Sequence, residues 1–98
     1  MDLELQPGFV VDALAAEAPV RKALAKLIRT AGRLTEQPLR DHKGIHLHRI
    51  QNQVDPVSGL PLEALEVTRS VRAKALVAKG RLVLISLHGE HDETSRPR

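Results

Sequence analysis

The sequence contains no cysteine, no tryptophan and no tyrosine, and its one aromatic residue is Phe9. Without cysteine the chain can form neither a disulfide framework nor a zinc site with thiolate ligands. With a single aromatic ring it lacks the row of stacking side chains on which many proteins bind single-stranded bases. We therefore expect a core made of leucine, valine, isoleucine and alanine.

Long apolar runs are also missing. No stretch of the sequence approaches the roughly 20 apolar residues that a helix needs to cross a bilayer. The segment from Met1 to Glu4 is acidic, whereas a secretory signal begins with basic residues and an apolar run. We expect a soluble cytoplasmic protein with no membrane partner.

The chain has 98 residues, with 15 Lys and Arg against 12 Asp and Glu, and a formal net charge of +3. This length predicts one compact domain, which we place at residues 1–91, with residues 92–98 as a flexible tail. The modest basic excess is compatible with a nucleic acid or an acidic protein as partner. On charge alone, an ordinary solvated surface is the simpler interpretation.

The first half of the sequence predicts a strand, two helices and a linker. Apolar and polar residues alternate in a short strand at residues 2–6, and residues 9–17 fit a short helix. Residues 19–32 predict a second helix, with a proline in its first turn and a glycine at its end. Its apolar stripe consists of Val20, Ala23, Leu24, Leu27, Ile28 and Ala31. Residues 33–43 are expected to form a polar linker that Leu39 anchors to the core.

The second half predicts strands. Residues 44–51 alternate like a strand, and residues 52–61 are rich in turn-forming residues. Residues 62–78 also fit a helix, but their alternation, which only Arg69 breaks, favours a strand. A tight Lys79-Gly80 turn then leads into a last apolar strand. The chain therefore predicts an α+β fold: a short N-terminal strand, a two-helix hairpin, then an antiparallel β-meander of three strands.

Four histidines lie on the predicted meander. His46 and His48 are two residues apart and are expected to share one face of their strand. His88 and His91 lie at the exit of the last strand, so all four rings converge if the two strands are neighbours. The spacing is not specific for a metal, and we predict no metal site. An isolated His-x-His pair is also compatible with a solvated face that has no specific role.

Arg72 and Lys74 share one face of the strand before the Lys79-Gly80 turn. A simple two-residue turn would place them beside Leu87 and Ile85, whereas a bulge would change the register and the neighbours. The two cations then either extend their stems along apolar surface or form a basic concave face that receives phosphate.

The ordered elements resemble those of the RelE/ParE superfamily of toxin–antitoxin toxins. Residues 9–27 resemble the opening helical hairpin of that family, and residues 39–50 (LRDHKGIHLHRI) resemble its passage into the second strand. Residues 70–73 (SVRA) resemble the strand that carries the key arginine of the family. Residues 81–93 resemble its terminal strand, in which an apolar run leads to a histidine and acidic residues. The resemblance covers nearly the whole chain.

The resemblance implies a function. Members of the ribonuclease branch cut mRNA, often on the ribosome, through attack of the 2′-hydroxyl on the adjacent phosphate. That reaction needs a base, cations for the phosphorane charge, and an acid for the leaving oxygen. The resemblance implies no metal and no cofactor. The partners that it implies are a cognate antitoxin protein and mRNA.

The resemblance also implies roles for individual residues. The predicted catalytic residues are His46, His48, Arg72 and His91, with Arg72 as the phosphate-stabilising arginine and His91 as the proton donor or acceptor. His88 takes the place of His91 if the strand exit is offset. The residues predicted to bind phosphate or RNA are Arg49, Lys74 and His88.

Two alternatives belong to other classes. The first is a non-catalytic gyrase inhibitor or protein-binding module on the same fold, in which the histidines have no role. The second is a DNA-binding domain with a recognition helix at residues 62–78.

Overall fold

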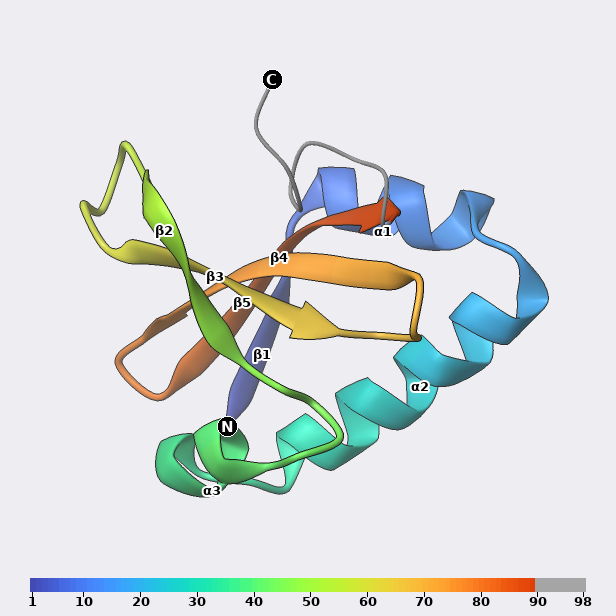
Figure 1. The fold of residues 1–98 in the computed structure, drawn as a ribbon, viewed down its shortest axis with the longest axis horizontal. Helices are drawn as coiled ribbons and strands as arrows, with labels where there is room; N and C mark the ends of the chain where they lie inside the picture. The colour runs from blue at the N-terminus through green and yellow to red at the C-terminus, as the bar shows by residue number, and fades with distance from the viewer. Residues whose placement is uncertain (90–98) are drawn as a thin grey trace.

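The computed structural model describes residues 1–89, so the tail expected at residues 92–98 lies outside the described residues. Strands and helices follow one another along this part of the chain (Figure 1). The strands are β1 (Asp2–Leu5), β2 (His48–Val54), β3 (Pro61–Glu66), β4 (Val71–Ala78) and β5 (Arg81–Gly89). The helices are α1 (Pro7–Ala15), α2 (Ala18–Gly32) and α3 (Glu36–Asp41). None of these helices combines the length and the apolar character needed to span a bilayer.

The five strands form one sheet in the order β1-β5-β4-β3-β2. The strands from β2 to β5 are an antiparallel meander, and β1 pairs parallel with β5, from Asp2 opposite Arg81 to Leu5 opposite Leu84. Strands that are far apart in the sequence, β1 and β5, therefore lie side by side (Figure 1). The predicted α+β class, the opening strand, the helical hairpin and the closing meander are confirmed.

The core lies between the helices and one face of the sheet. The helices contribute Phe9, which is 1% exposed, together with Leu24 and Leu27. The sheet contributes Leu65, Ala73, Ala75, Leu82 and Leu84, all of which are fully buried. As the composition predicts, the core is almost entirely aliphatic.

Helix α2 begins and buries its apolar stripe where the sequence predicts, whereas α1 spans Pro7–Ala15 and not the predicted residues 9–17, because Pro7 begins this helix. Pro7 and Pro19 lie in the first turns of α1 and α2, where a backbone N–H has no helical acceptor to lose. In α2 the buried side chains are Leu24, Leu27 and Ala31, at spacings of three and four. The basic side chains of α2 lie on its exposed side; they are Arg21, Lys22, Lys26 and Arg29.

The segment expected to be a polar linker, residues 33–43, contains α3. Leu39 is fully buried, as expected, and the burial of this side chain in the core stabilises a helix of only six residues. Two side-chain pairs one turn apart add to it: Gln37 donates to Asp41, and Arg40 to Glu36. Neither signal is strong enough on its own to predict a helix, because isolated helices of this length are unstable in water.

The meander has one strand more than expected, because residues 62–78 form β3 and β4 and not a single strand. The chain turns where Arg69 breaks the alternation. The Thr68 hydroxyl accepts hydrogen bonds from the backbone N–H groups of Ser70 and Val71, at 3.3 and 3.1 Å. Such a hydroxyl turn competes with strand pairing and reverses the chain.

Candidate functional site

The pairing of β4 with β5 contains a bulge that sets the geometry of the site. From Ala78 opposite Arg81 to Ala75 opposite Leu84, the hairpin has the register of a two-residue turn. The register then shifts, and Arg72 lies opposite His88. Ile85 is the extra residue of this bulge. A hairpin without the bulge would pair Arg72 with Leu87. Of the two registers that the sequence allows, the bulged one is therefore present, and it places His88 beside Arg72.

The face of the sheet that the helices do not cover carries the polar residues. Leu65 and Ala73 are opposite one another and belong to the core, so the side chains that alternate with them project from the other face. We call this the open face. It includes His48, Ala64, Glu66, Arg72, Lys74, Ser86 and His88, which the registers place in two rows.

One row of the open face crosses four strands, from His48 through Ala64 and Lys74 to Ser86. The side chain of Ala64 is small and buried, so nothing bulky separates His48 from Lys74. Neighbouring strands are about 4.8 Å apart, so these two residues are about 10 Å apart across the sheet. That gap is wide enough for a ligand group to lie between them.

The second row, Glu66, Arg72 and His88, carries both signs of charge. Glu66 and Arg72 are opposite in register but form no ion pair, and within residues 1–89 neither Arg72 nor Lys74 makes a side-chain hydrogen bond or ion pair. Both cations are half-buried. Two neighbouring cations without an anionic partner are a favourable arrangement for binding a phosphate group.

The histidine of β5, His88, is hydrogen-bonded to a serine. Ser86 Oγ lies 2.6 Å from His88 Nε2, and both side chains are half-buried on the open face. Ser86 is one of the residues that sequence analysis missed, because it comes to the open face only through the bulge. The predicted catalytic residue His91 lies outside the described residues.

The histidines near β2 are arranged differently from the expected strand pair. His46 precedes β2 and has a left-handed backbone, with φ of 54°, so the strand begins at His48 and not at Gly44. The two rings still touch, with centroids 5.5 Å apart and planes at 73°. Arg49 follows His48 along β2 and therefore projects from the opposite side of the strand.

The hydrogen bonding of His48 defines its tautomer. Its Nδ1 lies 3.0 Å from the carbonyl oxygen of His46, which can only accept, so Nδ1 carries the proton. In the neutral ring Nε2 then has a lone pair. An exposed imidazole with a lone pair at Nε2 can accept a proton from a hydroxyl group that lies beside it.

Asp12 of α1 accepts a hydrogen bond from β5 next to the bulge. The pairing of β1 ends at Leu84, so beyond that point one edge of β5 has no strand beside it. There the backbone N–H of Leu87 donates to Asp12 Oδ2, at 3.0 Å, in a partly buried contact. Helix α1 thus holds β5 between Ser86 and His88. No sequence signal identifies this contact, because it joins residues 75 positions apart.

A buried ion pair fixes α3 to the sheet. Arg40 Nη1 and Nη2 donate to the two carboxylate oxygens of Glu63, at 2.7 and 3.0 Å, and Glu63 is 3% exposed. This bidentate hydrogen bond is the main reason why the pKa of Arg40 is raised, and the Glu36 carboxylate adds to it. The spacing of Glu36 and Arg40 is visible in the sequence, but the pairing with Glu63 is not.

No protein-family model and no curated protein matches the chain. Solved structures do share its fold. A chain of the archaeal RelE–RelB complex from Pyrococcus horikoshii has a TM-score of 0.67 at 10% identity, over 92% of this chain and 94% of that chain. The RelB–RelE antitoxin–toxin complex from Methanococcus jannaschii gives 0.67 at 10% identity, over 89% of each chain. The YoeB/ParE toxin from Agrobacterium tumefaciens gives 0.59 at 18% identity, over 91% and 98%.

This chain therefore has the fold of the RelE/ParE superfamily of toxins, and the resemblance that the sequence suggested is confirmed at the level of the fold. The likeness extends over about nine-tenths or more of both chains in each comparison.

Proposed function

We propose that the protein is the toxin of a type II toxin–antitoxin pair and acts as a metal-independent endoribonuclease that cleaves mRNA and so inhibits translation. The observation that supports this most directly is the open face. Arg72 lies opposite His88, with Lys74 on the same strand, and neither cation has an anionic partner within residues 1–89.

The open face offers the groups that the reaction needs. The 2′-hydroxyl oxygen of RNA attacks the adjacent phosphorus and loses its proton to a base, for which His48 Nε2 is suited. Arg72 and Lys74 stabilise the additional negative charge of the phosphorane. The bond from phosphorus to the 5′-oxygen then breaks, and an acid protonates that oxygen. The products are a 2′,3′-cyclic phosphate and a 5′-hydroxyl.

The acid comes from the exit of β5 in this proposal. His88 lies opposite Arg72 and is coupled to Ser86, and the sequence also offers His91 for the same role. His46 touches the ring of His48 and orients it, and Arg49, on the other side of β2, adds positive charge for the RNA strand.

A protein partner is supported by helix α1, which exposes apolar side chains. Leu14 is 75% exposed, Val11 64% and Val10 38%. They lie on one short helix, and apolar residues that gather in this way mark surfaces for protein association. We propose that the cognate antitoxin covers this side of α1.

Incubation with translating ribosomes tests the ribonuclease proposal. The wild-type protein should cut mRNA and leave a cyclic phosphate. Arg72→Ala should lower the cleavage rate by about 100- to 1,000-fold and His48→Ala by about 100- to 10,000-fold. Arg69→Ala is the matched control, because Arg69 is exposed in the turn before β4, and this variant should keep the wild-type rate.

Intact mRNA at high protein concentration would refute the proposal. An assay of DNA supercoiling by gyrase would then test the non-catalytic alternative. In that case toxicity in cells should be unchanged by His46→Ala, His48→Ala and Arg72→Ala.

A further inference from the structure

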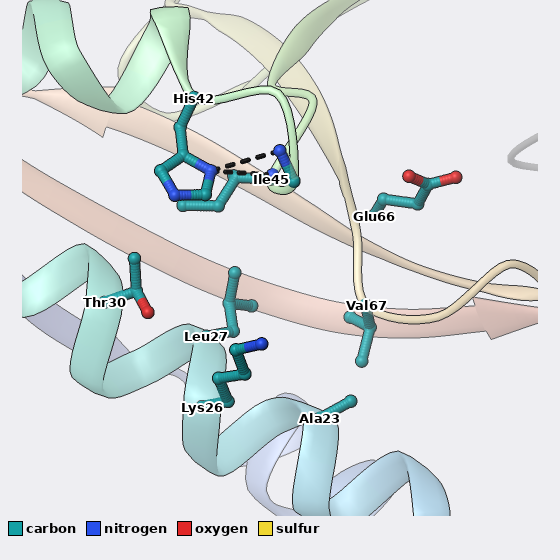
Figure 2. Close-up of a pocket in the computed structure, with 9 residues that line it drawn as sticks. Ala23, Lys26, Leu27, Thr30, His42, Ile45, Glu66 and Val67 are labelled. Atoms are coloured by element: carbon teal, nitrogen blue, oxygen red, sulfur yellow. Dashed lines mark hydrogen bonds between the residues drawn. The ribbon is translucent and has the colours of Figure 1, made fainter.

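A concave site lies on the helix side of the sheet. A pocket of about 270 Å³ opens between α2, the loop that joins α3 to β2, and the end of β3 (Figure 2). Its apolar walls include Leu27, Ile45 and Val67. None of the residues proposed above for RNA cleavage lines it, so its interpretation is independent of that proposal.

His42 presents a defined hydrogen-bond donor to this pocket. Its Nδ1 accepts from the backbone N–H groups of Gly44, at 3.1 Å, and Ile45, at 3.2 Å. Because Nδ1 is an acceptor in both bonds, the ring proton is on Nε2. Figure 2 shows the ring extending from the loop toward α2, with Nε2 on the side of Thr30. The two backbone bonds therefore hold Nε2–H in place as a donor.

Two more donors lie on the opposite wall. Lys26 and Thr30 are four residues apart, so they occupy one face of α2, and both line the pocket. Within residues 1–89, neither side chain makes a hydrogen bond or an ion pair. Glu66 also lines the pocket, but its carboxylate points away from His42 and Lys26 (Figure 2).

We propose that this pocket binds an aliphatic carboxylate. The ammonium of Lys26, the hydroxyl of Thr30 and Nε2–H of His42 supply donors for the anion, and the apolar walls receive a short hydrocarbon chain. A phosphate group fits less well, because no arginine lines the pocket and its apolar walls would remain without contacts. The volume is slightly below the roughly 300–1,000 Å³ of drug-sized sites. The ligand is therefore a small free acid or the glutamate side chain of a bound peptide.

An NMR titration tests the carboxylate. Pentanoate should produce saturable shifts of the Gly44 and Ile45 amide signals, because both amides bind the imidazole that holds the ligand. Pentanol has the same chain without the charge, and acetate has the charge without the chain. Both should need at least about tenfold higher concentrations, since a charged hydrogen bond or several buried methylenes are lost.

Substitutions on α2 locate the site. Thr30→Val keeps the shape of the side chain, and we expect pentanoate to bind about three- to tenfold more weakly. Lys26→Gln should weaken binding about two- to fivefold, because Lys26 is exposed. Lys22→Gln, one turn earlier on α2 and outside the pocket, is the matched control and should leave the affinity unchanged.

A short peptide that contains glutamate, compared with the same peptide carrying glutamine, distinguishes the two sources. Tighter saturation by the glutamate peptide than by pentanoate identifies a protein side chain as the ligand. Saturation by pentanoate alone identifies a free acid. Equal shifts with pentanol and pentanoate, no saturable shift with either acid, or equal losses for Lys22→Gln and Lys26→Gln would each overturn the proposal.

Discussion

Replacing Asp12 by alanine is expected to loosen β5 at the bulge and to destabilise the domain. The variant removes the acceptor that lies 3.0 Å from the Leu87 nitrogen, in a partly buried contact. A hydrogen bond to a charged group contributes about 1.5–3 kcal/mol. Because this contact is only partly buried, we expect the free energy of unfolding to fall by about 1.5–2 kcal/mol.

The same loss can be expressed as a melting temperature. In a domain of this size, 1 kcal/mol corresponds to about 4–8 °C, so Asp12→Ala should lower Tm by about 6–16 °C. Asp12→Asn keeps an oxygen acceptor but loses the charge. Neutral hydrogen bonds contribute about half as much, so this variant should lose only about 0.5–1 kcal/mol.

Urea unfolding and amide hydrogen exchange measure the two parts of this prediction. Exchange of the Leu87 amide should accelerate in Asp12→Ala more than that of amides in β3, because the opening is local to β5. Glu17→Ala is the control, since Glu17 is exposed and its side chain makes no cap hydrogen bond. Equal stability of the two alanine variants, or an unchanged Leu87 amide, would show that Asp12 does not hold the bulge.

Three further predictions concern other parts of the molecule. Arg40→Met should lower the free energy of unfolding, measured in urea, by about 2–3 kcal/mol, because it leaves the buried Glu63 carboxylate unpaired. Adding Glu63→Gln should recover at least half of that loss, and additive losses in the double variant would contradict this. Lys79→Asn should raise the free energy of unfolding by about 0.5–1 kcal/mol, since φ is 50° at Lys79 and such turns favour Asn before Gly; an unchanged urea midpoint would show that the turn is unstrained. Leu14→Asp should reduce co-purification of a co-expressed antitoxin while leaving Tm within about 3 °C, whereas Val57→Asp, at a residue 94% exposed, should reduce neither; equal retention by both would argue against α1 as the antitoxin surface.

The sequence predicted those parts of the fold that depend on residues close together in the chain. The stripe of α2 and the Lys79-Gly80 turn are both found where the sequence places them, because periodicity and turn chemistry act over a few residues. The sequence did not separate β3 from β4. Arg69 marked the break, but a hydroxyl turn at Thr68 and a strand that continues past a charged residue produce similar patterns.

The candidate site was predictable only in part. Arg72 and Lys74 share a face through simple alternation, which the sequence shows. That His88 lies opposite Arg72 depends on the bulge at Ile85, and the bulge depends on what lies beside β5. Its partner there, Asp12, is on a helix at the other end of the sequence, and a single sequence contains no signal for such a contact.

The neighbouring positions of β1 and β5 have a consequence for synthesis. A ribosome makes β1 first, but the strand that pairs with it emerges only after residue 81. Until then β1 has no partner, and His88 is not yet beside Arg72. Domains generally fold as units as they leave the ribosome. The nascent chain therefore carries an incomplete open face until β5 has been made, and the surface proposed to cleave RNA is complete only after β5 has left the exit tunnel of the ribosome that made it.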